Sequence, residues 1–336
     1  MIIICKSNTS ANEVNILKEK LESERISIVI NNVDNNYVLI TPKGSLYDFS
    51  SLYAYDFVQN IIDNKVPFIK ASREYQSENT IIDVNGVKIG GEKLVFIAGS
   101  CSVESEEQID GLMKALKNSK TNIFRAGAYK PRTSPYSFDG LKDKGLSILK
   151  EKKEKYQFPI VSEILDKNQL PLFIESVDII QVGARNMQNF DLLDALGKID
   201  KPILLKRGFG STIEEWLLAA EHILSQGNKK VILCERGIKT FENSTRYTLD
   251  ISSIPVVKKL SHLPIIVDPS HAAGNFEYVE SLAKAAIAAG ADGLMIEVHE
   301  DPVNALSDGK QSLRIDKYLE LIKKIERIAI AIDRKI

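Results

Sequence analysis

A chain of 336 residues, 44% of them hydrophobic, is long enough to bury one large core and still form a smaller domain. Its 44 Lys and Arg nearly balance its 45 Asp and Glu, which excludes the strong positive field that non-specific nucleic-acid binding requires. No apolar run approaches the roughly 20 residues of a membrane span, and residues 1–10 lack the features of a secretion signal. We therefore expect a soluble, cytoplasmic protein that binds neither membrane nor nucleic acid.

Residues 1–71 have a pattern of their own, in which apolar runs at 2–5, 26–30, 37–40 and 67–71 alternate with helical stretches after residue 10 and around 51–62. Ser10, followed three residues later by Glu13, forms a capping box that starts the first helix. The order βαββαβ predicts a ferredoxin-like domain, which more often binds an effector or a subunit than carries chemistry. The polar stretch 72–79 is predicted to be the linker to a second domain at 80–336.

In this second part, short β-branched runs alternate with amphipathic helical segments. Asn85-Gly86 between apolar runs predicts a hairpin first. Eight strands are predicted after it, at 94–100, 122–128, 159–165, 178–184, 202–208, 230–237, 264–271 and 292–299. Eight strands alternating with helices over about 250 residues predict an α/β fold of the (β/α)₈ TIM-barrel type. A doubly wound open sheet is the alternative, but the turn AGSCSVES after the first strand lacks the pattern G-x-G-x-x-G.

The carboxyl ends of the strands carry the active site in a (β/α)₈ barrel. Here each predicted strand ends in, or leads into, a reactive or charged side chain. In chain order these are Cys101, Arg125 with the Lys130 loop, Glu163, Arg185, Lys206 with Arg207, Glu235 with Arg236, Asp268 with His271, and Glu297 with His299. A rim selected only for stability would rarely have such residues at all eight positions, so the pattern predicts a site.

Positive charges form the first set of residues at this mouth. Arginine binds phosphate in a bidentate manner and lysine supplies a point charge, so six cations imply at least two anionic groups, such as two phosphates and a carboxylate. One loop is held between Pro131 and Pro135, which suits a loop that is preorganised for a ligand. For Arg207 and Glu235 we favour a structural ion pair. The six cations are Arg125, Lys130, Arg132, Arg185, Lys206 and Arg236.

A possible metal site forms the second set. The three cysteines, at 5, 101 and 234, are too few and too scattered for a disulfide framework, so each is a buried residue, a nucleophile or a metal ligand. By spacing alone Cys101 is a buried residue. Barrel closure makes the first strand a neighbour of the eighth, which lets Cys101, His271, Glu297 and Asp308 meet. These donors suit a divalent ion such as Zn²⁺, Fe²⁺ or Mn²⁺. We expect His222 at the surface, and His262 and His299 in packing or supporting roles.

Seven segments in this order resemble a known family. They are AGSCSVES, RAGAYKPRTSPYSFDGL, QVGARNMQNFDLL, LLKRGFGSTIEEW, ILCERGIKTFENSTRYTLDIS, VDPSHAAG and EVHEDPVNALSDGKQSL. They are similar to the 3-deoxy-D-arabino-heptulosonate 7-phosphate (DAHP) synthases, in particular the type I-beta branch with an N-terminal ferredoxin-like domain. The resemblance covers residues 80–315. It implies a metal-dependent condensation of phosphoenolpyruvate with erythrose 4-phosphate, with release of phosphate, as the first step of the shikimate pathway to aromatic amino acids.

The resemblance also implies residue roles. Arg125, Lys130 and Lys206 would face the carboxylate of phosphoenolpyruvate, while the backbone of Gly183 and Ala184, with Arg185 and Arg236, would hold its phosphate. Arg132 and Thr133 would hold the phosphate of the aldose. Lys130, Arg125, Glu163 and His271 are the implied catalytic residues, and Cys101, His271, Glu297 and Asp308 match the family's metal ligands. A homotetramer, and inhibition by tyrosine or phenylalanine at the N-terminal domain, are further expectations.

The chain departs from the family pattern in one motif, where Ser100 replaces the usual proline before Cys101. We expect this change to loosen the backbone there.

Three alternative functions differ from the main prediction. The sister 3-deoxy-D-manno-octulosonate 8-phosphate synthases use arabinose 5-phosphate but have K-A-N-R-[ST] where residues 130–134 are KPRTS. A Schiff-base aldolase would use Lys206 and ignore chelators, and a non-catalytic effector-binding protein would have no use for a metal beside phosphate sites.

Overall fold

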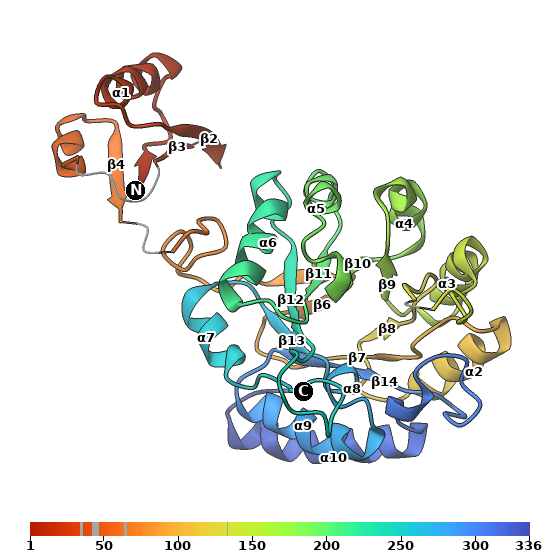
Figure 1. Cartoon of the computed structure of the whole chain (residues 1–336). Helices are drawn as coiled ribbons and strands as arrows, with labels where there is room; N and C mark the ends of the chain where they lie inside the picture. Colours follow the sequence, from red (N-terminus) through yellow and green to blue (C-terminus); the bar gives the residue numbers. More distant parts are fainter. Residues whose placement is uncertain (34–35, 42–46, 64–65, 133) are drawn as a thin grey trace. The chain divides into compact units, whose positions relative to one another are not determined.

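The computed structural model describes residues 1–336 except 34–35, 42–46, 64–65 and 133. Its contacts divide the chain into two compact units, Met1–Ile69 and Lys70–Ile336 (Figure 1). In the part of the chain that is described, no helix is long and apolar enough to cross a membrane.

The first unit is a four-stranded antiparallel sheet with one α-helix. The strands lie in the order β2-β3-β1-β4, which is the order of a ferredoxin-like domain. Ser10 and Glu13 form the predicted capping box at the start of the helix, whose apolar face packs into the core of the unit. The elements are β1 (Ile2–Cys5), α1 (Ala11–Ser23), β2 (Val29–Val33), β3 (Asn36–Ile40), the 3₁₀ helix η1 (Phe49–Ala54) and β4 (Val58–Ile62).

The end of this unit differs from the sequence prediction. We predicted a helix around 51–62 and a strand at 67–71, whereas the structure has the short helix η1 and then the strand β4, with no strand at 67–71. The strand β4 pairs with β1, with Ile61 opposite Ile3 and Val58 opposite Cys5. A short apolar run fits a helix or a strand equally well. Here pairing with β1 selects the strand.

The segment 72–79, which we expected to be a linker, is hydrogen-bonded to the second unit. The amide of Arg73 donates to the carbonyl of Leu260 at 2.9 Å, and its Nε donates to the carbonyl of Lys258 at 2.7 Å. The amide of Thr80 donates to the carbonyl of His262 at 2.9 Å. The stretch is therefore packed against the end of helix α7 (Ser253–Leu260) and the residues that follow it.

The second unit is a closed parallel barrel of eight strands surrounded by helices, as predicted (Figure 1). The strand order is β10-β11-β12-β13-β14-β7-β8-β9, so β7 and β14 are neighbours. The strands are β7 (Val95–Gly99), β8 (Ile123–Arg125), β9 (Ile160–Ile164), β10 (Ile179–Val182), β11 (Ile203–Lys206), β12 (Val231–Glu235), β13 (Ile265–Val267) and β14 (Gly293–Glu297).

Helices follow the barrel strands and cover their outer face (Figure 1). They are α2 (Glu106–Leu116), α3 (Lys142–Tyr156), η2 (Lys167–Gln169), α4 (Leu170–Ser176), η3 (Ala184–Asn186), α5 (Phe190–Leu196), α6 (Ile213–Ser225), α7 (Ser253–Leu260), α8 (Pro269–Ala273), α9 (Phe276–Ala288), η4 (Gly309–Gln311) and α10 (Ile315–Ala331). Helix α6 carries Trp216, which is fully buried and whose indole N–H donates to the carbonyl of Leu205 in β11 at 3.2 Å.

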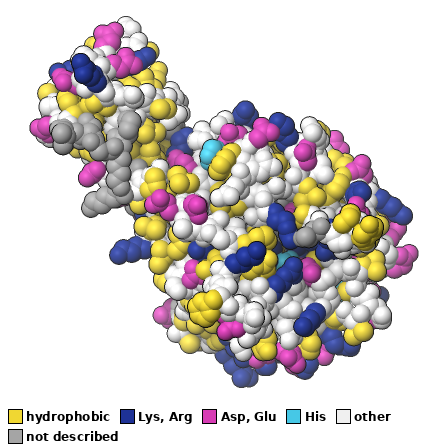
Figure 2. All heavy atoms as spheres, in the orientation of Figure 1, with side chains coloured by type: hydrophobic (Ala, Val, Ile, Leu, Met, Phe, Trp, Pro, Cys, Tyr) yellow, Lys and Arg dark blue, Asp and Glu magenta, His cyan; other side chains and the backbone are white. Residues whose placement is uncertain are grey.

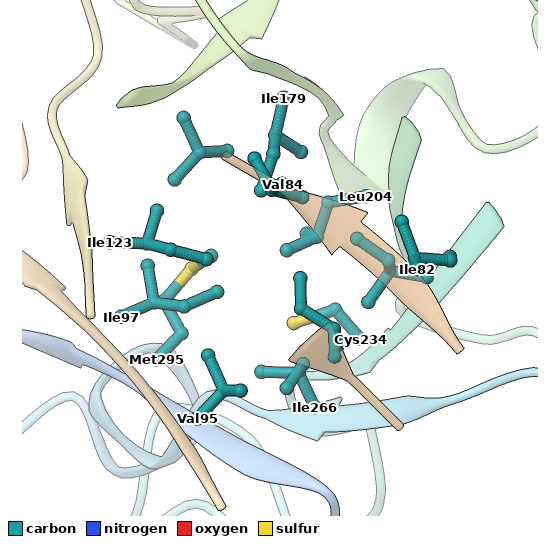
Figure 3. Close-up of a cluster of buried hydrophobic side chains, with 13 residues drawn as sticks. Ile82, Val84, Val95, Ile97, Ile123, Ile179, Leu204, Cys234, Ile266 and Met295 are labelled. Atoms are coloured by element: carbon teal, nitrogen blue, oxygen red, sulfur yellow. The ribbon is translucent and has the colours of Figure 1, made fainter. Parts of the chain in front are cut away.

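The predicted hairpin closes the amino-terminal end of the barrel. Strands β5 (Ile82–Val84) and β6 (Val87–Ile89) pair across Asn85-Gly86, and both turn residues have positive φ, as a two-residue hairpin turn requires. Side chains of the hairpin pack with apolar residues from all eight barrel strands (Figure 3). This amino-end cluster consists of Ile82, Val84, Ile89, Val95, Ile97, Ile123, Val161, Ile179, Leu204, Ile232, Cys234, Ile266 and Met295.

Candidate active site

The side chains predicted at the strand ends lie at the carboxyl end of the barrel. Arg125, Lys206 and Glu297 are the last residues of β8, β11 and β14. Cys101 comes shortly after β7, and Arg236 comes directly after β12. Figure 2 shows Lys and Arg side chains gathered near the middle of the second unit. The strand-end pattern therefore located the charged mouth of the barrel.

Four of these residues form a compact cluster of possible metal ligands. One donor atom each from Cys101, His271, Glu297 and Asp308 lies within 4.8 Å of the others. The Cys101 sulfur is 3.3 Å from Asp308 Oδ2, and His271 Nε2 is 3.4 Å from Glu297 Oε1. A thiol, an imidazole and two carboxylates at this spacing fit a borderline divalent cation, because three or four such donors around one point are typical of its sites.

Buried neighbours orient these ligands. His271 Nδ1 lies 2.7 Å from Asp268 Oδ2, which leaves Nε2 to face the cluster. The fully buried Asp268 also accepts two hydrogen bonds, one from the amide of His271 at 2.9 Å and one from the ammonium of Lys206 at 2.5 Å. Glu297 Oε1 accepts a hydrogen bond from Arg125, and Glu297 Oε2 accepts one from Gln311 Nε2 at 2.6 Å. Each ligand is thus held by a further hydrogen bond or ion pair.

The protonation states of the cluster suit a cation. Burial lowers the pKa of His271, which favours the neutral, ligating imidazole. Burial alone would raise the pKa of Glu297 and Asp308, but nearby positive groups outweigh it and hold both pKa values below the usual range. Burial, together with the negative charge of the neighbouring Glu297, raises the pKa of the Cys101 thiol to about 12. A divalent ion would convert this thiol to the thiolate.

A cavity of about 300 Å³ opens beside the cluster and is lined mainly by polar and charged groups. His271 and Asp308 form part of its wall, so the metal-ligand cluster faces the cavity. Five of the six predicted cations line it as well. The lining residues are Lys130, Pro131, Arg132, Ser134, Ser137, Glu163, Gly183, Ala184, Arg185, Lys206, Phe209, Arg236, Arg246, His271 and Asp308.

The cations of the mouth differ in their partners. Arg207 Nη1 lies 2.9 Å from Glu235 and 2.8 Å from Asp250, so the predicted structural ion pair is confirmed. In contrast, Lys130 Nζ donates to the carbonyl of Cys101 at 3.1 Å, and Arg132 donates to the carbonyl of Phe138 and the hydroxyl of Ser307. Among the described residues, neither Lys130 nor Arg132 forms an ion pair. Their charges face the cavity without a counterion.

Comparison with known proteins identifies the family. Residues 72–333 match the DAHP synthetase I family. The chain belongs to this family. A curated relative, the phospho-2-dehydro-3-deoxyheptonate aldolase of Thermotoga maritima, is 44% identical over 337 residues and spans 100% of both chains. The 2-dehydro-3-deoxyphosphooctonate aldolase of Geobacter sulfurreducens is 34% identical over 74% of this chain and 97% of its own length.

Solved structures agree with this assignment to the DAHP synthetase I family. The crystal structure of the DAHP synthase of T. maritima superposes with a TM-score of 0.80 at 44% identity, over 99% of this chain and 98% of the other. A truncated form of the T. maritima enzyme, 49% identical, matches 79% of this chain with a TM-score of 0.74. The full-length match therefore includes residues before the family region as well as the barrel.

Two of the residues expected at the substrate site of a DAHP synthetase are placed differently from the rest. Arg125 is buried against Glu297 and is absent from the cavity lining, so in this structure it contacts a member of the Cys/His/Glu/Asp cluster and not the cavity. Thr133 lies outside the described residues. Glu163 and Gly183 are in contact at the wall: a Cβ on Gly183 would lie 1.9 Å from Glu163 Oε1, so a larger residue there would displace the Glu163 carboxylate.

Sequence reasoning missed three residues of the site. Arg246 lines the cavity, and its Nη1 lies 3.3 Å from Asp308 Oδ1. Phe209 also lines the cavity. Ser307 places its hydroxyl 3.0 Å from the Cys101 sulfur. All three lie in loops beyond the strand ends, so inspecting only strand ends could not find them. All three do lie inside motifs that resemble the family, Phe209 in LLKRGFGSTIEEW, Arg246 in TRYTLDIS and Ser307 in ALSDGKQS, and those motifs were the available signal.

The remaining histidines and Ser100 have structural roles. His222 on α6 is 2.9 Å from Asp194 and partly exposed, as expected. His262 is buried between the hydroxyl of Thr80 and the carbonyl of Lys70, at 2.7 and 2.6 Å. His299 lies 3.6 Å from Glu104. Ser100 is fully buried, and its hydroxyl donates to the carbonyl of Ser102 at 2.7 Å, so the turn that we expected to be loosened has a hydrogen bond of its own.

Proposed function

We propose that this chain is a DAHP synthase, which joins phosphoenolpyruvate to erythrose 4-phosphate and releases phosphate. The observation that carries the proposal is one cavity that combines a Cys/His/Glu/Asp cluster with several cations that form no ion pair within the described residues. The two substrates bring two phosphates and one carboxylate, which are the anions that such a cavity can neutralise. The full-length relative from T. maritima has this activity by name.

The cavity wall suggests how each substrate would bind. Arg185 and Arg236, with the backbone at Gly183 and Ala184, would hold the phosphate of phosphoenolpyruvate, and Lys206 would face its carboxylate. Lys206 keeps its own partner, Asp268, so it can approach a carboxylate without an unbalanced buried charge. On the other side of Lys130, Arg132 would hold the phosphate of the aldose. Two phosphates would thus be held apart, with the reacting carbons between them.

The chemistry needs an electrophilic aldehyde and a proton donor. A divalent ion held by Cys101, His271, Glu297 and Asp308 would supply Lewis-acid polarisation of the aldehyde oxygen. The Lys130 ammonium lines the cavity and is anchored on the carbonyl of Cys101, so it is placed to give a proton to the oxygen of the aldehyde as the enol carbon attacks. Holding both substrates in line can itself lower the barrier by roughly 7–11 kcal/mol.

Departure of phosphate completes the reaction. Water adds to the oxygen-bearing carbon of the former enol, the bond from that carbon to the phosphate oxygen breaks, and a ketone forms. The Glu163 carboxylate lines the cavity and accepts a hydrogen bond from Gln181 Nε2 at 3.1 Å. We assign to this carboxylate the role of orienting the attacking water. Arg185 and Arg236 are already in position to stabilise the leaving phosphate, so little reorganisation is needed at that step.

The geometry disfavours the Schiff-base alternative. Lys206 is buried, and its Nζ lies 2.5 Å from Asp268 Oδ2. Attack of this nitrogen on a carbonyl carbon would require the buried ion pair with Asp268 to be broken first. The sister octulosonate activity is the closer rival, since relatives with that name are 34% identical over 74% of the chain. Pro131, within KPRTS, is the sequence feature that argues for the shorter aldose.

The test is phosphate release from phosphoenolpyruvate with either erythrose 4-phosphate or arabinose 5-phosphate. Each assay is run on the enzyme as isolated, after treatment with EDTA, and after restoring Mn²⁺ or Zn²⁺. We expect turnover with erythrose 4-phosphate that disappears on chelation and returns with metal. Preference for arabinose 5-phosphate would reject the proposed acceptor. Turnover that ignores EDTA would reject the metal site.

The finer expectations are part of the same proposal. We propose that Mn²⁺, Fe²⁺ or Zn²⁺ occupies the cluster, that the chain assembles as a homotetramer, and that tyrosine or phenylalanine inhibits it through residues 1–71. The donor set supports a borderline ion but does not select one. Metal analysis of the purified protein, light scattering, and rates at saturating tyrosine or phenylalanine address these points. Unchanged rates with both amino acids, and after deletion of residues 1–70, would reject the inhibition.

A further inference from the structure

Two aromatic rings are stacked beside the cavity, and one of them, Phe209, is a lining residue. The ring centroids of Phe209 and Tyr247 are 5.0 Å apart, and the ring planes differ by only 4°. Phe209 lies in the loop after β11, and Tyr247 lies in the loop after β12. The Cζ atom of Arg236 is 4.1 Å from the Tyr247 centroid and 4.8 Å from the Phe209 centroid, and Arg185 Cζ is 5.3 Å from Phe209. These distances are in the range of cation–π contacts.

Arg236 differs from other buried cations of the barrel mouth. Arg125, Lys206 and Arg207 each form an ion pair with a carboxylate. Arg236 is 3% exposed, and its Nη1 is buried without a hydrogen-bond partner. Within the described residues its guanidinium forms no ion pair. An isolated buried charge is costly, so the two ring faces, together with the more distant carboxylate of Asp268, are the described groups that stabilise it.

Backbone contacts fix the ring pair in place. The amide of Tyr247 donates to the carbonyl of Ala272 at 2.8 Å, and the amide of Lys239 donates to the carbonyl of Phe209 at 2.7 Å. Gly237, at φ +90°, leaves room for this arrangement, because a Cβ there would lie 2.7 Å from the Tyr247 Cβ. The backbone of Phe209 is therefore bonded to the loop after β12, which begins at Arg236 and carries Tyr247.

We propose that Phe209 and Tyr247 are positioning residues for the phosphate-binding arginines of this site. Their faces hold the guanidinium of Arg236, and that of Phe209 also holds Arg185, while leaving the N–H donors free. A carboxylate partner would occupy those donors and would compete with the ligand. The ring pair thus keeps two arginines ordered and available for one phosphate group. The inference rests on the proposed function, because it concerns the phosphate of phosphoenolpyruvate.

The test compares Tyr247→Leu and Phe209→Leu with the matched control Tyr247→Phe in the metal-loaded full-length protein. Tyr247→Phe keeps the ring face and loses only the hydroxyl. Calorimetry gives the Kd of phosphoenolpyruvate and of inorganic phosphate, and kinetics give KM for each substrate. Loss of one ring face should raise the Kd and KM of phosphoenolpyruvate by roughly 3- to 30-fold. KM for erythrose 4-phosphate should stay within about two-fold, and Tyr247→Phe should resemble the wild type.

Each outcome decides the inference. Equal effects of the Leu and Phe variants at position 247, whether large or absent, would overturn it, because the ring face would then not be the group that acts. If Tyr247→Leu does not fold, Phe209→Leu and pentafluorophenylalanine at position 209 replace it. The fluorinated ring keeps its shape but reverses its electrostatics, so it should weaken phosphate binding. If the wild type fails to turn over, the proposed function fails, while the phosphate-binding comparison still tests the ring pair.

Discussion

The two ends of the barrel differ in chemistry although the same strands build both. The amino end is closed by the hairpin and an apolar cluster, whereas the carboxyl end is charged. Two residues along a single strand separate the apolar cluster from the charged site, as Leu204 and Lys206 show in one strand and Met295 and Glu297 in another. Successive inward-facing residues of a barrel strand lie in successive layers. One layer supports the fold and the next carries the chemistry, so the two should be separable by mutation.

The largest expected effect is on activity, at the charged end. Cys101→Ala removes one of the four proposed ligand groups, and we expect turnover to fall by about 1,000-fold, because loss of the ion would remove several kcal/mol of charge stabilisation. Turnover and bound metal are measured together in the purified variant. A Cys101→Ala protein that keeps wild-type activity and remains sensitive to EDTA would show that the ion is held elsewhere.

Asp268→Asn should affect both layers. The substitution leaves the buried ammonium of Lys206 without its counter-charge, which should lower the free energy of unfolding by about 3–5 kcal/mol. It also removes the carboxylate that orients His271, so metal affinity or activity should fall by about 10- to 100-fold. Urea unfolding and metal titration give the two values. A variant that loses activity at full stability would mean that the pair is not important for folding.

At the amino end we expect the opposite result. Ile89→Ala removes a fully buried side chain of the hairpin, and this should lower the free energy of unfolding by about 2–5 kcal/mol. The exposed Ile81 provides the matched control, for which the change should be within about 0.5 kcal/mol. The kcat/KM of folded Ile89→Ala should stay within about two-fold of the wild type. A selective loss of kcat/KM would show that the two layers are coupled.

The smallest effect concerns pH, at a histidine of the amino end. Burial lowers the pKa of His262 below its ordinary value of 6.5, so the unfolded chain takes up this proton at a higher pH than the folded protein. The resulting contribution to stability is present above pH 6.5 and is lost as the pH falls toward the folded-state pKa. In urea unfolding at pH 7.5 and 5.5, the wild type should therefore lose more stability than His262→Gln. Equal losses in both proteins would exclude this contribution.

The eight strands and their charged ends were predictable because each buried strand is a short β-branched run, and barrel topology places the following residue at the mouth. Arg246, Phe209 and Tyr247 were not predictable in this way. They act from loops, and the path of a loop depends on backbone contacts such as that of Tyr247 with Ala272. The strand at 58–62 was missed for a similar reason, because its conformation is decided by a partner strand more than fifty residues earlier in the chain.

Trp216 is the only tryptophan of the chain. Its indole is buried and hydrogen-bonded to the carbonyl of Leu205, one residue before Lys206, and Arg207 Cζ lies 5.9 Å from the indole ring. The protein therefore contains a single tryptophan fluorophore, which can be excited selectively over the tyrosines, directly behind the cavity. Its emission would report ligand binding in the native sequence without an added dye, and a change in its lifetime could be assigned to one strand of the barrel.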